Sequence, residues 1–183
     1  MRKTLLPAAL VMCWGLAQPA SAEMFAFNLD GQIGYSILQN IEVPNSSPVR
    51  GQNLSDMAVG ARAKLKILFL CLMADYQHFV IKNADYLHAG LGVDFGLPLG
   101  VVKPYVRGSV GLIVLAAKAD AFSPKAGADL DATVGFQARA GVGLDIPLGS
   151  WFAVGASFDF GYHLVTGRWG YDLSAMGYLG LRI

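Results

Sequence analysis

Ionisable residues recur at alternate positions along most of this chain, and they are the residues best placed to do chemistry. From Ala132 to Ile146, apolar side chains occupy the even positions, whereas Gln137, Arg139 and Asp145 occupy odd positions. Across the chain, seven aspartates and seven basic residues share this polar parity: Asp30, Asp56, Asp75, Asp94, Asp145, Asp159 and Asp172, and Arg62, Lys64, Lys66, Lys103, Arg107, Arg139 and Arg182. Because unpaired buried charges are costly, the matched numbers predict a network of ion pairs.

One histidine, His78, raises the possibility of catalysis. It has the apolar parity of its segment. A hydrolase would need a hydroxyl nucleophile within hydrogen-bond reach of such a histidine, and an acid to orient it. The serines of the expected strands all have the opposite parity: Ser36, Ser109, Ser157 and Ser174. We therefore expect no enzyme activity and no catalytic residues.

The remaining histidines and the single cysteine of the expected mature chain give little support for a metal or a disulfide. His88 and His163 have the polar parity, but no Cys or Glu lies near them in sequence, and zinc usually takes three or four such ligands. Cys71 has no cysteine partner once the leader is removed. We expect neither a metal nor another cofactor.

The elements that would position these residues are long, alternating strands. A hairpin runs from Asp131 to Leu164 around the turn Pro147–Ser150, and its strands exceed the roughly five or six residues usual in globular sheets. Its polar face mixes charges with many glycines. That mixture suits the cramped interior of a narrow barrel whose apolar face meets lipid.

The first 22 residues are expected to be a secretory signal peptide. Arg2 and Lys3 precede an apolar run, and Ala20-Ser21-Ala22 offers a small-residue cleavage site. Cleavage there leaves residues 23–183 as the mature chain, whose length is that of one domain. It leaves 12 basic residues against 13 acidic ones, a net charge of −1 that gives no argument for nucleic-acid binding.

Eight strands are expected in the mature domain. They cover about 25–38, 56–67, 72–80, 86–97, 102–115, 132–146, 152–164 and 171–183. Longer polar loops are expected at 40–53 and 116–130, and shorter turns at 82–85, 98–100, 147–150 and 166–170. The reversal near 68–71 has no Gly, Pro, Asn or Asp to mark it, so only the change of parity locates it.

Composition agrees with a membrane barrel. Hydrophobic residues make up 54% of the chain, yet no apolar run approaches the roughly 18 residues of a spanning helix. A spanning strand needs only about ten residues, half of them apolar. The predicted fold class is all-β: an eight-stranded antiparallel up-and-down transmembrane β-barrel.

The leader, the eight strands and the final segment together resemble the small outer-membrane barrels of Gram-negative bacteria, the family of OmpX and the OmpA transmembrane domain. Residues 177–183 resemble the family's C-terminal assembly signal, with apolar residues at positions 179, 181 and 183, although the family usually ends in Phe and this chain in Ile183. The resemblance implies an outer-membrane location, contact with outer-membrane lipid or lipopolysaccharide, recognition of the last strand by the barrel-assembly machinery, and a monomer.

The sequence suggests three hypotheses about function. We favour a structural or surface-interaction role with a lumen plugged by the ion network, because eight strands leave little free bore. The alternative is a narrow channel or transporter for small or apolar solutes. The third hypothesis, an acyl hydrolase acting on lipid A through His78, lacks an outward serine. The loops at 40–53 and 116–130 show no adhesive signature.

Overall fold

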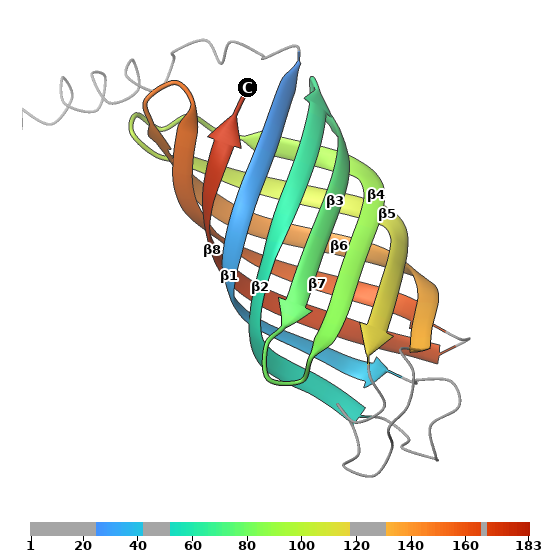
Figure 1. The fold of residues 1–183 in the computed structure, drawn as a ribbon. Helices are drawn as coiled ribbons and strands as arrows, with labels where there is room; N and C mark the ends of the chain where they lie inside the picture. Colours follow the sequence, from blue (N-terminus) through green and yellow to red (C-terminus); the bar gives the residue numbers. More distant parts are fainter. Residues whose placement is uncertain (1–24, 42–51, 118–130, 166–167) are drawn as a thin grey trace, which may run out of the picture.

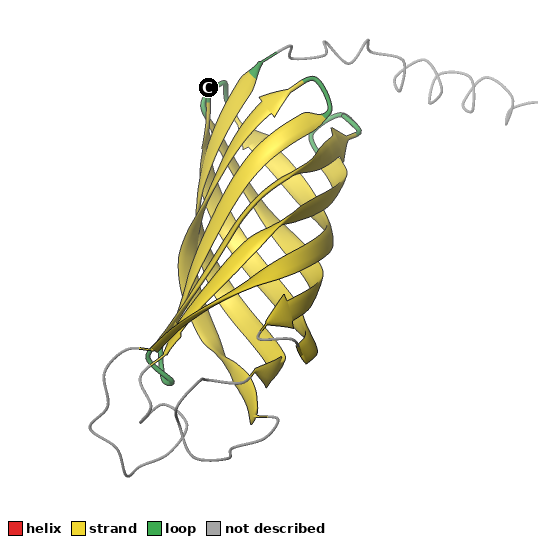
Figure 2. Ribbon diagram, turned by 90° about the vertical axis from the view of Figure 1, so that its right-hand side faces the viewer, coloured by secondary structure: helices red, strands yellow, loops and turns green. Residues whose placement is uncertain are grey.

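The computed structural model describes residues 25–41, 52–117, 131–165 and 168–183, and the regular elements in these ranges are strands (Figure 2). They are β1 (Ala26–Ile41), β2 (Gln52–Ile67), β3 (Leu70–Phe79), β4 (Ala84–Gly96), β5 (Lys103–Ala117), β6 (Asp131–Leu148), β7 (Phe152–Val165) and β8 (Arg168–Arg182). The expected leader, residues 1–22, lies outside the described residues.

The sheet closes on itself. Each strand pairs antiparallel with the next, and β8 pairs back with β1 (Figure 1). At the seam, the Phe27 amide donates to the Ile183 carbonyl over 2.7 Å, and the Ile183 amide donates to the Phe27 carbonyl over 2.9 Å. The predicted eight-stranded antiparallel barrel is confirmed, and closure leaves no unpaired strand edge.

The alternation of the sequence separates the inside of the barrel from the outside. Phe136 is 67% exposed, whereas its neighbour Gln137 is 3% exposed. Such a contrast between adjacent residues follows from the two-residue period of a strand. The molecule therefore buries its polar side chains and exposes a belt of large apolar ones, which is the arrangement that a lipid environment requires.

The barrel has two distinct ends. The start of β1 and the end of β8 lie together with the connections β2–β3, β4–β5 and β6–β7, and we call this the turn end (Figure 1). At the opposite end, which we call the loop end, β1, β3, β5 and β7 finish and β2, β4, β6 and β8 begin. Aromatic rings stack on the outer surface near both: Phe69 with Phe95 at the turn end, and Tyr162 with Trp169 at the loop end.

Several strands extend further toward the loop end than the sequence predicts. β1 continues to Ile41, which pairs with Gln52, and β5 continues to Ala117, which pairs with Asp131. β8 begins at Arg168, opposite Val165. The predicted loops at 40–53, 116–130 and 166–170 were too long, because polar residues near a strand end still pair when the neighbouring strand continues beside them.

The unmarked reversal between β2 and β3 consists of Leu68 and Phe69 alone. β3 begins at Leu70, so the predicted turn at 68–71 has the right place but extends two residues too far. Leu68 has a φ of 57°, a conformation that β-carbon sterics disfavour for every residue except glycine. The turn therefore has no residue that favours it, which is why the sequence did not mark it.

Candidate functional site

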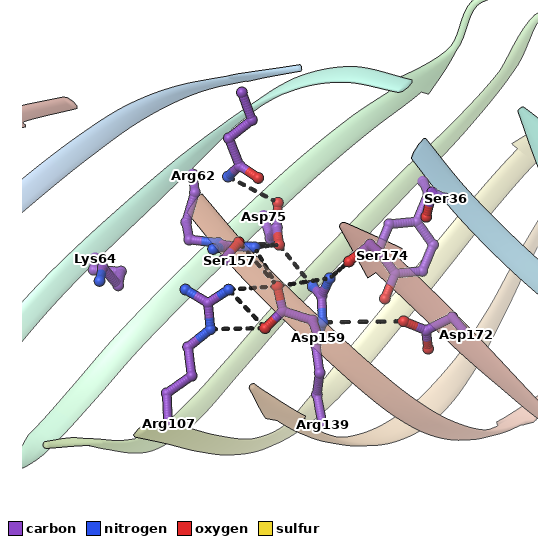
Figure 3. Close-up of polar contacts among 12 residues, drawn as sticks. Ser36, Arg62, Lys64, Asp75, Arg107, Arg139, Ser157, Asp159, Asp172 and Ser174 are labelled. Carbon is purple, nitrogen blue, oxygen red and sulfur yellow. Dashed lines mark hydrogen bonds and ion pairs between the residues drawn. The ribbon is translucent and has the colours of Figure 1, made fainter. Parts of the chain in front are cut away.

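Five charged side chains from five different strands meet inside the barrel (Figure 3). They are Arg62 of β2, Asp75 of β3, Arg107 of β5, Arg139 of β6 and Asp159 of β7, and all five are buried. Each occupies an inward position of its strand, so the alternation of the sequence directs them all into the lumen. We call these five residues the central cluster.

Asp159 is the common partner of the three arginines. The Nε and Nη2 atoms of Arg107 donate to Asp159 Oδ1 over 2.8 and 2.6 Å, a two-pronged bond that suits a guanidinium. Arg62 Nη2 donates to Asp159 Oδ2 over 3.2 Å, and Arg139 Nη2 lies 3.8 Å from the same oxygen. One carboxylate therefore joins three strands on different sides of the lumen.

Asp75 is the second acceptor of the central cluster. Arg62 donates to Asp75 Oδ2 through Nη2 over 2.6 Å and through Nε over 3.1 Å, and Arg139 Nη1 donates to it over 2.6 Å. Three arginines and two aspartates leave one excess positive charge. Asp172 Oδ2, which lies 4.0 Å from Arg139 Nε, supplies a third carboxylate.

Neutral polar groups continue the network around β6. Arg139 Nη2 donates to Ser174 Oγ over 3.0 Å. The side-chain amide of Gln137 donates to Asp172, and the Tyr86 hydroxyl donates to Gln137 Oε1 over 2.6 Å. A buried network of this kind constrains the relative positions of the strands that contribute to it, although Arg107 Nη1 and Arg139 Nε have no hydrogen-bond partner among the described residues.

Two smaller groups of charges lie closer to the turn end. Arg182 Nη2 lies 3.1 Å from Asp145 Oδ1, and Arg182 Nη1 also contacts Asp30. Asp94 pairs with both Lys64, at 3.1 Å, and Lys66, at 3.6 Å. The ion pairs thus extend from the central cluster toward the turn end.

Two of the fourteen expected network residues behave differently. Asp56 accepts backbone N–H groups instead: Oδ2 accepts from Ile81 over 2.6 Å and from Lys82 over 2.8 Å, which holds the β3–β4 turn. Lys103 forms no ion pair with another described residue, and its side chain lies against Gly96. Their expected place in the ion network is therefore corrected, because parity fixes the face of a residue and not its partner.

The sequence analysis missed an apolar cluster on the inward face at the loop end. Its buried members are Leu38, Leu54, Phe79, Ala84, Tyr86, Ile113, Leu115 and Val165. We call it the loop-end cluster. The signal was present in the sequence, since Ile113 and Leu115 continue the inward parity of Arg107 and Ser109 along β5. It was overlooked because only polar residues were sought on the inward face.

The two inward histidines are buried without a hydrogen-bonding partner in the described part of the chain. Neither ring nitrogen of His88 or of His163 has one. His163 Nδ1 lies 3.8 Å from Asp172 Oδ1, too far for a hydrogen bond. Among the described residues, no group of three or more His, Cys, Asp or Glu side chains is arranged to hold a metal ion.

His78 lies on the outer face of β3 near the loop end, and an acid does orient it. Its Nδ1 lies 2.8 Å from Asp85 Oδ1 on β4, and the Tyr76 hydroxyl donates to the same oxygen over 2.6 Å. We call His78, Asp85 and Tyr76 the interfacial cluster. The orienting acid that a catalytic histidine requires is therefore present.

An outward serine is also present, which corrects the sequence analysis. β2 begins at Gln52, and Ser55 has the outward parity of Met57. Its Oγ is hydrogen-bonded to the Tyr35 hydroxyl at 2.5 Å. Val59 is the β2 residue opposite His78, so Ser55 lies four residues further along the strand, roughly 13 Å away at the usual rise. It is too distant to serve as a nucleophile for His78.

Comparison with solved structures identifies the architecture. Neisserial surface protein A superposes with a TM-score of 0.59 at 14% sequence identity, covering 88% of this chain and 97% of that one. The chain has the fold of a small outer-membrane barrel. The N-terminal barrel domain of Pseudomonas aeruginosa OprF also matches, with a TM-score of 0.49, 15% identity, and coverage of 86% and 97%.

The likeness to these outer-membrane barrels is one of structure and not of sequence. No family model matches the chain, and no curated protein sequence matches it. The chain therefore shares the fold of these outer-membrane barrels, and its exterior is apolar as theirs must be in lipid. The internal charges and the loop-end cluster must then be explained from this chain's own residues.

Proposed function

We propose that this outer-membrane barrel has a closed lumen and serves a structural or surface-interaction role. The proposal is carried by two groups of side chains that follow each other along the lumen, the central cluster and the loop-end cluster. We call them the two blocks because each would obstruct a passing solute. The central cluster ties β2, β3, β5, β6 and β7 together by ion pairs. Closer to the loop end, the buried apolar residues of the loop-end cluster point into the same lumen.

The two blocks oppose solute passage for different reasons. Breaking a buried ion pair leaves an uncompensated charge, so the arginines and aspartates do not separate easily. The apolar residues of the loop-end cluster offer a passing polar solute no hydrogen bonds. A transporter, the alternative from the sequence, would need both blocks to move aside. The central cluster alone makes that costly.

Liposome swelling in a small sugar tests the closed lumen and both blocks. We expect vesicles containing the wild-type protein to swell no faster than protein-free vesicles. The paired variant Arg107→Ser with Asp159→Ser removes one buried arginine and the aspartate shared by all three arginines, without changing the net charge. It should also remain impermeable, because the loop-end cluster stays in place.

Adding Phe79→Ala to that pair should raise the swelling rate, because both blocks are then weakened. Ser157→Ala, an inward substitution beside Asp159, is the matched control and should have no effect. Swelling with the wild-type protein would refute the closed lumen.

The surface-interaction part of the proposal concerns the loop end. The connections there lie at the outer surface if the short turns face the periplasm, as they do in barrels of this kind. Deleting residues 118–130 should reduce attachment of bacteria to a host-cell or matrix surface if the loop makes contacts. Unchanged attachment, with normal amounts of the protein in the membrane, would leave the structural role alone.

We also propose a monomer that reaches the membrane through the barrel-assembly machinery. Support comes from the last strand, where Leu179 and Ile183 present exposed apolar side chains on the lipid face. We propose no catalytic role. His78 has its orienting acid, but Ser55 is too far from it to act as the nucleophile.

A further inference from the structure

The lipid-facing belt is interrupted by an open groove lined by residues of β7, β8, β1, β2 and β3, which are neighbours in the sheet. Small outward residues form it: Gly31 of β1, Ala61 of β2 and Gly177 of β8. A Cβ atom built at Gly31 or Gly177 would find no atom closer than 3.8 Å, so both glycines leave real space. The groove is a shallow depression of about 890 Å³ that is open along its length.

The register of the strands gives the groove its direction. One outward row of paired residues runs across five strands, from β7 to β3: Val154, Leu179, Gly31, Ala61 and Tyr76. Val154 lies two residues from the start of β7 at the turn end, whereas Tyr76 lies three residues from the end of β3 at the loop end. The row therefore climbs through the membrane from one end of the barrel toward the other.

An empty groove on this face would lose its dispersion contacts, so hydrocarbon must fill it. The lining is almost wholly apolar below His78, with Ile33, Val59 and Val154 along its sides. A slender acyl chain matches a trough of this direction. A second copy of the barrel matches it less well, because its membrane-facing surface is itself convex and apolar.

The polar end of the groove indicates the kind of headgroup. His78 and Tyr76 line that end, and Asp85 is bonded to both through Oδ1. No described residue donates to Asp85 Oδ2, and its side chain is 39% exposed. A carboxylate accepts hydrogen bonds from hydroxyl groups. We propose that the groove binds a glycolipid of the outer leaflet, with one acyl chain in the trough and sugar hydroxyls at the interfacial cluster.

Native mass spectrometry of the detergent-purified protein tests this proposal, with lipid A as the glycolipid probe and phosphatidylcholine, whose headgroup has no hydrogen-bond donor, as the comparison. The wild-type protein should retain one lipid A molecule and bind it more tightly than phosphatidylcholine. Gly31→Leu with Gly177→Leu fills the trough and should weaken lipid A binding by about tenfold, which corresponds to roughly 1.4 kcal/mol. Asp85→Asn should also weaken it, through the headgroup.

Ala140→Leu is the matched control, because Ala140 is an outward small residue on β6, away from the groove. It should bind lipid A as the wild-type protein does. Ala61→Leu provides an independent filling of the trough if the double glycine variant does not fold, as judged by heat-modifiable mobility in a gel.

Three results would overturn the proposal. Equal retention of lipid A by all folded variants would show that the groove is not the site. Equal binding of phosphatidylcholine and lipid A would remove the headgroup preference. A wild-type dimer that becomes a monomer on filling the trough would assign the groove to a second copy of the chain.

Discussion

At the scale of single residues, Asp159 is the most connected charge in the lumen, since all three arginines of the central cluster lie within ion-pair distance of it. Asp159→Ala would leave three guanidinium groups with only Asp75 and Asp172 as acid partners. We expect a loss of roughly 3–5 kcal/mol in the free energy of unfolding, the usual cost of removing one partner from a buried ion pair. Urea unfolding in lipid vesicles measures it.

Ser157→Ala serves as the control for that experiment. Ser157 donates to Asp159 over 3.4 Å, which is long for a hydroxyl donor, so its loss should cost about 1 kcal/mol or less. If Asp159→Ala cost no more than Ser157→Ala, the central cluster would not hold the barrel together.

The partners of individual inward residues could not be predicted from the sequence. Alternation placed Asp56 and Asp75 on the same inward face, and both are buried there. Asp75 binds two arginines, whereas Asp56 binds the backbone of a turn. The difference depends on the register between strands and on the position of the β3–β4 turn, neither of which a single strand's sequence contains.

At the scale of elements, the period-two pattern was sufficient to predict all eight strands and the face of each residue. Strand ends were harder to predict. Ser55 lies between the predicted loop at 40–53 and the predicted strand at 56–67, yet β2 continues through it beside β1. Pairing with a long neighbour decides where a strand ends, and that information lies in the other strand.

The β2–β3 turn gives a prediction at this scale. Leu68→Gly would replace a leucine at a φ of 57° with the one residue that adopts that conformation without strain. We expect a gain of about 1 kcal/mol in the free energy of unfolding, since the left-handed conformation costs other residues roughly 1–2 kcal/mol.

Phe69→Gly, at the neighbouring position, is the control for the turn. Phe69 does not have a positive φ, and it stacks on Phe95, so its replacement should destabilise the barrel. A destabilising Leu68→Gly would mean that the apolar contacts of Leu68 outweigh its backbone strain. Chemical denaturation of the three proteins side by side decides the matter.

At the scale of the whole molecule, the sheet closes into a barrel and side chains point into its lumen. The barrel has no free edge, its exterior is apolar, and its interior is occupied by ion pairs and by the loop-end cluster. The sequence predicted closure and the inward charges. It did not lead us to expect the loop-end cluster or the exterior groove, because both arise when residues from several strands meet at one level of the barrel.

The central claim is that this lumen is shut, and planar-bilayer recording of the purified wild-type protein tests it most directly. We predict no stable conductance at moderate voltage, because the ion pairs of the central cluster and the apolar side chains of the loop-end cluster leave ions no continuous polar path. A steady, reproducible open level would contradict the account.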